Sequence, residues 1–211
     1  MKNKEIKMSG NIDKVINFWF GNITDQLSPV EKHKLWYQAT PEDDENIRSQ
    51  FEHLYEQAFH GLLANWLESA KGTMALIILL DQMPRNMYRG TDRAFLSDHL
   101  ALDYCLKGLS KGYDRQLQLV ERAFFYHPLE HAENLKMQQV CVIEFQRLQQ
   151  VYQGDAQQEF IRGSLSYAKQ HLEIIENFGR FPYRNKVLGR ESTAEELEFL
   201  KQGINFGQAG N

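Results

Sequence analysis

The sequence is poor in cysteine and has no long hydrophobic run. Only Cys105 and Cys141 occur among its 211 residues, and they form no C-x-x-C pair, so we interpret both as reduced core residues. The longest purely apolar stretch covers residues 75–80, which is far too short to cross a bilayer. Residues 1–11 are polar and rich in lysine and precede no apolar segment, so we expect no signal peptide. These features predict a cytoplasmic protein with no membrane partner.

An excess of positive charge is also absent. The formal net charge is −4, with 24 lysines and arginines against 28 acidic residues. Because binding to a phosphate backbone needs a basic surface, we expect no nucleic-acid partner, although net charge does not constrain a single cleft. Hydrophobic residues make up 42% of the chain, as is typical of a globular protein. No proline- or serine-rich linker divides it, so we expect one domain over residues 1–211, with frayed ends at 1–11 and 203–211.

Alternating strand patterns are nearly missing, whereas helix signals are abundant. Capping sequences begin at Ser28, Thr40 and Ser192. Apolar residues recur every three or four positions along residues 141–152 and 161–175, as on one face of a helix. These rules predict about nine or ten helices, at residues 13–20, 29–39, 42–60, 62–70, 73–82, 92–110, 114–126, 129–152, 155–177 and 194–202. The short loops favour antiparallel neighbours, and the pattern as a whole predicts an all-α fold.

Two turns of the chain are similar to each other. Residues 83–90 read MPRNMYRG, and residues 181–190 read FPYRNKVLGR. Each combines a proline, an Arg-Asn pair and a glycine beside an arginine, and each follows a strongly apolar helix. We interpret the two turns as equivalent corners of two stacked helical hairpins.

Several motifs, in order along the chain, resemble one protein family. They are FWFG at residues 18–21, LLDQMPRNMYRG at 79–90, PLEHAE at 128–133, and FGRFPYRN with the following LGR and ST at 178–193. Over about residues 15–200 the chain resembles the uncharacterised bacterial family called domain of unknown function 924. The resemblance implies an all-helical, tetratricopeptide-like stack and little chemistry, because the family carries no assigned activity. His127 departs from the family pattern, in which an apolar residue is expected.

The first candidate site is the turn that contains Asp81, Arg85, Asn86 and Arg89. Asp81 ends an apolar run and would be costly to bury alone, and Arg85 can pair with it if the helix continues past Pro84. One interpretation is an anion pocket, since guanidinium groups bind carboxylates and phosphates bidentately. The other is a tied helix corner, in which Arg85 binds Asp81 and Asn86 acts as a cap.

The second candidate site is the loop that contains Arg180, Arg184, Asn185 and Arg190. Its arginines make the loop locally basic, and the neighbouring proline and glycine hold such a loop in a fixed shape. It is either part of a ligand site or a solvated loop whose arginines bind carbonyl groups at helix C-termini.

The third candidate site is the sequence YHPLEHAE. His127 and His131 are four residues apart, a spacing compatible with a metal on a helix, but we expect Pro128 to start a helix between them. No second cluster of histidine, cysteine or aspartate lies nearby in the sequence, so we expect no metal ion and no cofactor. A single acid–base histidine is the better interpretation, with His131 beside Glu130 or Glu133.

No phosphate loop, dinucleotide fingerprint or nucleophile elbow accompanies these candidates. We therefore favour a helical-repeat binding scaffold with an arginine-rich pocket for an acidic peptide or a small anionic molecule. The alternative is a small-molecule enzyme of the hydrolase or transferase type, in which His131 works with Glu130 or Asp81 as acid and base. His171, beside an apolar stripe, is more typical of the edge of the core. The predicted ligand-binding residues are Arg85, Asn86, Arg89, Arg180, Arg184, Asn185 and Arg190.

Overall fold

The computed structural model describes residues 2–203 and 206, and it confirms the prediction of an all-α fold. No strand occurs in this part of the chain. The α-helices are α1 (Lys2–Phe20), α2 (Val30–Tyr37), α3 (Pro41–Phe59), α4 (Ala70–Ile77), α5 (Met83–Met87), α6 (Asp98–Ser110), α7 (Leu119–Glu130), α8 (Leu135–Val151), α9 (Asp155–Phe178) and α10 (Ala194–Leu200). Tetratricopeptide-like stacking stays a prediction. Among the described helices, none has the length and apolar character needed to span a membrane.

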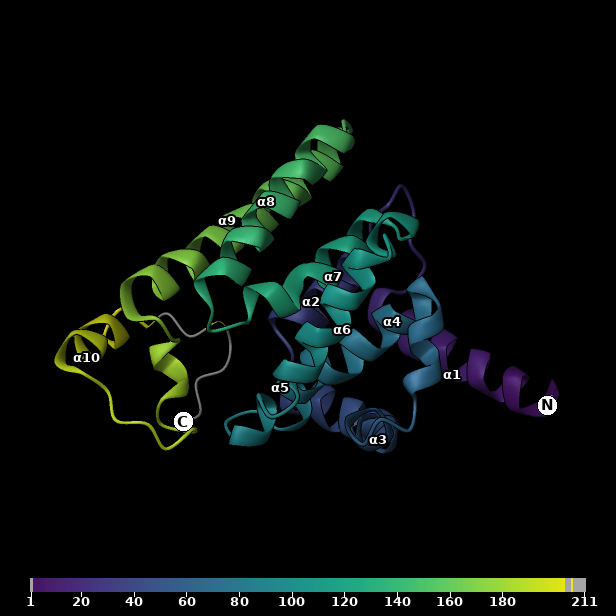
Figure 1. Ribbon diagram of the computed structural model, residues 1–211, viewed down its shortest axis with the longest axis horizontal. Helices are drawn as coiled ribbons and strands as arrows, with labels where there is room; N and C mark the ends of the chain where they lie inside the picture. Colours follow the sequence, from purple (N-terminus) through teal and green to yellow (C-terminus); the bar gives the residue numbers. More distant parts are fainter. Residues whose placement is uncertain (1, 204–205, 207–211) are drawn as a thin grey trace.

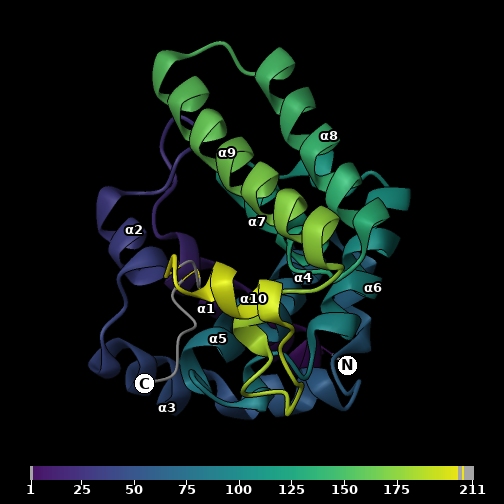
Figure 2. The ribbon, with the colours of Figure 1, turned by 90° about the vertical axis from the view of Figure 1, so that its left-hand side faces the viewer.

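Helices α4 and α5 are joined by a π-helical turn, η2 (Ile78–Gln82), into one continuous helical segment. Every residue of α4 except Lys71 is buried, and burial continues through η2 as far as Asp81. A helix that is apolar all round is typical of the interior of a protein. Helices α1, α3, α6 and α7 contact this central segment, and Figures 1 and 2 show it enclosed among them.

Helices α8 and α9 form a long antiparallel hairpin that extends away from the other helices (Figure 1). Most of the apolar stripe that periodicity predicts on α9 is buried, namely Ile161, Leu165, Ala168 and Ile175, while Leu172 is half-buried. His171 belongs to the same buried face. Because α7 contacts both helices of the hairpin, this packing places the inner face of α9 against α7.

Two of the predicted capping sequences start helices in the structure. The Thr40 side chain accepts a hydrogen bond from the third residue of α3, whose carboxylate binds the Thr40 backbone in return. Helix α10 begins with the same arrangement, but it uses Thr193 and Glu196, one residue later than predicted. The prediction at Ser28 is wrong, because no side-chain cap forms at the start of α2.

Several predicted boundaries also differ from the structure. Helix α7 continues through Pro128, so the prediction that this proline starts a helix is wrong. A proline near a helix C-terminus removes only one backbone hydrogen bond. The next helix begins after Asn134, whose side chain accepts a hydrogen bond from the first turn of α8. Helix α1 already begins at Lys2, within the segment predicted to fray. The predicted frayed tail, 203–211, lies almost entirely outside the described residues.

Candidate functional site

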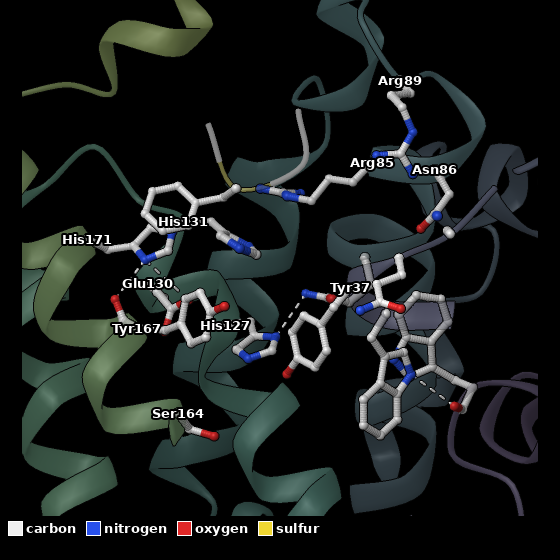
Figure 3. A pocket seen from close by; sticks show the side chains of 16 residues that line it. Tyr37, Arg85, Asn86, Arg89, His127, Glu130, His131, Ser164, Tyr167 and His171 are labelled. Atoms are coloured by element: carbon white, nitrogen blue, oxygen red, sulfur yellow. Dashed lines mark hydrogen bonds and ion pairs between the residues drawn. The ribbon is translucent and has the colours of Figure 1, made fainter. Parts of the chain in front are cut away.

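A cavity of about 430 Å³ lies between the central segment, α2, α7 and α9. This volume is within the range of small-molecule sites. Aromatic rings form part of its wall, including those of Trp36, Tyr37 and Tyr167. Figure 3 shows the polar part in two groups. His131, His171 and Glu130 lie on one side, Asn86 and Arg89 lie on the other, and the side chain of Arg85 extends between the two groups.

A carboxylate–imidazole pair lies at the polar wall. Asp81 is completely buried in η2, and His131 directly follows the last residue of α7. The two carboxylate oxygens of Asp81 lie 2.8 and 3.0 Å from His131 Nδ1. Gln82 donates a further hydrogen bond to Asp81, and Arg85 Nη1 lies 3.5 Å from its Oδ1. Because an ionised carboxylate only accepts hydrogen bonds, His131 Nδ1 carries the proton and Nε2 keeps its electron pair.

His127 lies one helical turn before His131 and lines the same cavity. Gln82 Nε2 donates to His127 Nδ1 at 3.1 Å, so one amide group links His127 to Asp81. Burial, and then the neighbouring His131, lowers the pKa of His127 to about 3. The imidazole is therefore uncharged at neutral pH. Its ring packs against Phe124 at a centroid distance of 4.5 Å.

Glu130 and His171 lie next to His131. Glu130 is 5% exposed and His171 is 3% exposed. His171 Nδ1 donates to the carbonyl oxygen of Tyr167 at 2.9 Å and lies 3.6 Å from Glu130 Oε1. Burial, and then the charge of Asp81, raises the pKa of Glu130 to about 8. Burial also lowers the pKa of His171 to about 4 and that of His131 well below its usual value.

The two similar turns meet at a single carboxylate. Arg85 on α5 donates from both terminal nitrogens to the Asp98 oxygens, at 3.0 Å each. Arg184 donates to Asp98 Oδ2 at 3.3 Å, and its guanidinium carbon lies 4.6 and 4.5 Å from the ring centroids of Phe95 and Phe181. Arg85 lines the cavity described above, whereas Arg184 lines a neighbouring one. The structure thus brings these two arginines together around a carboxylate of the protein.

Arg89 and Asn86 also bind a carboxylate of the protein. Arg89 donates from Nε and Nη2 to Asp44 on α3, at 2.8 and 2.9 Å. Asn86 Nδ2 donates to the same carboxylate at 2.8 Å. Both residues line the cavity, and both tie α5 to α3. Asn86 therefore connects two helices through its side chain, whereas the corner interpretation expected it to cap one.

The remaining predicted residues of the second turn lie outside the cavity. Arg180 binds Glu196 at 2.6 and 2.8 Å, and Asn185 donates to the same carboxylate at 3.2 Å. Arg190 binds the Glu133 carboxylate at 2.6 and 2.9 Å. Glu133 is therefore a partner of Arg190, while the carboxylate bound to His131 is Asp81. These contacts hold the loop against α10 and the end of α7.

Sequence reasoning missed Asp98 and Asp44, the carboxylates that bind the cavity arginines. Each lies in the first turn of a helix, α6 or α3, where an acidic residue is ordinarily explained by the helix dipole. The sequence did contain one signal of such carboxylates, because the two turns contain more arginines than acidic residues. A buried excess of arginine requires carboxylates from elsewhere in the chain.

The fold and the site define an all-helical protein with a buried cluster of histidines and carboxylates beside a cavity. The chain belongs to the bacterial family of proteins of unknown function DUF924, whose family model matches residues 15–204. A solved structure of a protein of unknown function from Agrobacterium tumefaciens is similar, with 31% sequence identity and a TM-score of 0.76. The alignment covers 93% of this chain and 99% of that one. No curated protein matches the chain.

Proposed function

We propose that this protein is an enzyme of the hydrolase or transferase type that acts on a small molecule in the cavity. The observation that carries the proposal is the Asp81–His131 pair, with a 2.8 Å contact between a fully buried carboxylate and a histidine of the cavity wall. A carboxylate that fixes the tautomer and orientation of a histidine is the arrangement that acid–base catalysis uses.

Asp81 prepares the imidazole in two ways. It accepts the Nδ1 proton, so that Nε2 has an electron pair available, and its negative charge stabilises the imidazolium formed when Nε2 takes a proton. Asp81 is in turn held by Gln82 and Arg85, so the pair has a fixed geometry. A water molecule or substrate hydroxyl within hydrogen-bond reach of Nε2 would transfer its proton to His131 as its oxygen bonds to the substrate. The imidazolium would then return that proton to the leaving group as its bond to the substrate breaks.

The cavity favours a substrate with an apolar or aromatic part and an anionic or polar part. Trp36, Tyr37 and Tyr167 offer ring surfaces to the first part. Arg89 and Asn86 offer hydrogen-bond donors to the second part from the opposite side of the cavity (Figure 3). An anionic group there would share the Arg89 guanidinium with Asp44. This shared contact would orient the substrate without binding it very tightly.

The binding-scaffold prediction has less support from the geometry. A pocket for an acidic peptide requires guanidinium groups that can turn to the peptide, whereas Arg85, Arg89 and Arg190 each bind a carboxylate of the protein. A peptide would have to replace these carboxylates, and for Arg85, the most buried of the three, separating the ion pair costs several kcal/mol. Among the described residues, none binds His131 Nε2, so the acid–base pair meets no such competitor there.

The test is an activity screen with small chromogenic phosphate esters, carboxylic esters, amides and lactones. We expect His131→Gln to lower kcat on an accepted substrate by about 10²–10⁴-fold, because it removes the proton acceptor. Asp81→Asn should also lower kcat, because it removes the charge and the tautomer control. The control is His99→Gln, an exposed histidine of α6. Equal turnover by wild type and His131→Gln would refute the proposal, and stabilisation by small anions without any turnover would favour the scaffold.

A further inference from the structure

Two histidines and a glutamate meet at one end of the cavity. One nitrogen of His131, one nitrogen of His171 and one carboxylate oxygen of Glu130 lie within 4.8 Å of one another. Figure 3 shows these three side chains grouped on the same side of the cavity. They come from α9 and from the end of α7, elements that periodicity alone does not bring together.

Both imidazoles are held in the form that a metal ion requires. His131 Nδ1 is bound to the Asp81 carboxylate, and His171 Nδ1 donates to the carbonyl oxygen of Tyr167 at 2.9 Å. With each Nδ1 proton engaged by an oxygen acceptor, each Nε2 keeps an electron pair. A histidine ligand whose other nitrogen donates to a carboxylate or a backbone carbonyl is the usual outer-shell arrangement of metal sites.

Glu130 is a buried carboxylate without a counter-charge. Within residues 2–203 and 206 it forms no ion pair with lysine or arginine, and its nearest partner is His171 Nδ1 at 3.6 Å, beyond hydrogen-bond distance. The neighbouring Arg85 and Arg184 are both engaged by Asp98. Burial disfavours the ionised form of such a carboxyl group, and a bound cation would offset that cost, so this position favours a cation.

We infer that His131, His171 and Glu130 form a binding site for a divalent transition-metal ion of the zinc class, with Asp81 as the outer-shell partner of His131. Two imidazoles and one glutamate are a donor set of catalytic zinc sites, which leave a further position open for water or substrate. Here the open position would face the cavity. The site includes His171, which was not among the residues considered when the sequence predicted no metal ion.

The distances are consistent with an ion of this size. Zinc bonds of about 2.1 Å in tetrahedral geometry place the ligand atoms about 3.4 Å apart. Because the three donor atoms already lie within 4.8 Å of one another, they must approach by at most about 1.4 Å. Glu130 can supply that movement because none of the residues that the structure describes holds its carboxylate by a hydrogen bond.

The inference deepens the proposed function. Only the catalytic role of the ion rests on that proposal, whereas the binding of the ion does not. With an ion bound, the electron pair of His131 Nε2 serves the metal, and a metal-bound water, whose pKa falls to about 7 in such sites, provides the nucleophile. Asp81 keeps its role of orienting His131. Metal binding itself is measured without any substrate.

The experiment is a zinc titration of the full chain, stripped with a chelator and then dialysed, in competition with a chromophoric chelator. We expect one zinc ion per chain, at least 100-fold weaker binding in His131→Ala, His171→Ala and Glu130→Gln, and binding weaker by about 10–100-fold in Asp81→Asn. The matched control is His127→Gln, a half-buried histidine of the same cavity outside the triad, which should bind zinc like wild type. Circular dichroism of each metal-free variant establishes that it is folded, and Glu130→Gln and Asp81→Asn preserve side-chain size.

Two outcomes would overturn the inference: wild type binding zinc no more tightly than His171→Ala, or His127→Gln losing binding as much as the triad variants. Failure of the inference and failure of the proposed function are distinguishable. Zinc binding with no turnover of any substrate would support the metal site and count against the enzyme. Turnover that depends on His131 in zinc-free protein would support the enzyme and refute a catalytic metal.

Discussion

Replacing Asp98 tests whether one carboxylate holds the two similar turns together. Asp98 binds Arg85 and Arg184, whose side chains are 10% and 5% exposed. Asp98→Asn preserves the size of the side chain and removes its charge. Two guanidinium groups then stay buried with less negative charge to balance theirs. Removing one partner of a buried ion pair costs about 3–5 kcal/mol, which is the expected decrease in the free energy of unfolding. For a chain of this size it corresponds to a melting temperature lower by about 6–20 °C.

A matched control lies on the same helix. Asp103 on α6 pairs with Lys107 at 2.6 Å, and these side chains are 50% and 58% exposed. Because exposed pairs of this kind contribute about 0.2–1 kcal/mol, Asp103→Asn should change stability little. The assay is urea unfolding monitored by circular dichroism. Free energies of unfolding are compared only between proteins with the same m-value, which is the slope of the free energy against urea concentration.

The contrast between the two variants decides the question. A loss for Asp98→Asn as small as that for Asp103→Asn would refute the reasoning, because it would mean that solvent compensates the two arginines. A second substitution sharpens the test. Adding Arg184→Met to Asp98→Asn should recover part of the lost stability, because it removes one of the uncompensated charges. A further loss of stability in the double variant would show that packing of Arg184, not its charge, dominates.

Two other predictions concern packing and pH. Gly108→Ala should destabilise by about 1–3 kcal/mol, because an added Cβ would lie 2.4 Å from the buried ring of Phe125. Gly163→Ala, with no atom within 4 Å of the added Cβ, should stabilise α9 by about 0.5–1 kcal/mol, and urea unfolding that gave both variants the same sign would contradict the packing. The hydrogen bond from Arg180 is the main cause that lowers the pKa of Glu196 from 4.5 to about 2, so this pair stabilises fully above about pH 4.5 and is lost as pH falls toward 2. In acid titration Glu196→Gln should therefore lose stability less steeply than wild type, and parallel curves would count against the pair.

The sequence predicts where most helices lie better than it predicts where they end. The predicted helix at residues 155–177 differs from α9, Asp155–Phe178, by a single residue, because periodicity is a property of the helix's own side chains. Pro128 was misinterpreted because the same residue type is tolerated both at a helix start and near a helix end. The choice between these depends on the packing of α7 against its neighbours, which local sequence does not contain.

The geometry of the candidate site could be anticipated from the sequence only in part, for the same reason. Asp81, Arg85 and His131 stand in conspicuous motifs. In the structure Asp81 is fully buried and contacts both Arg85 and His131, which line the cavity. Which arginine binds which carboxylate could not be predicted, because Asp98 reaches Arg85 and Arg184 through tertiary packing. His171 is buried, as a core-edge histidine would be, and its position beside Glu130 follows from the contact between α7 and α9.

The π-turn η2 makes the site depend on the length of the chain as well as on its chemistry. A π-turn contains one residue more than an α-turn, so each side chain beyond it is rotated by about 100° around the helix axis. Asp81 lies within η2 and Arg85 follows it, so the direction of each depends on the added residue. Deleting one residue of η2 before Asp81 would leave every site residue in the chain and still turn Asp81 away from His131. The number of residues in this single turn therefore determines the geometry of the site as much as the identity of its side chains does.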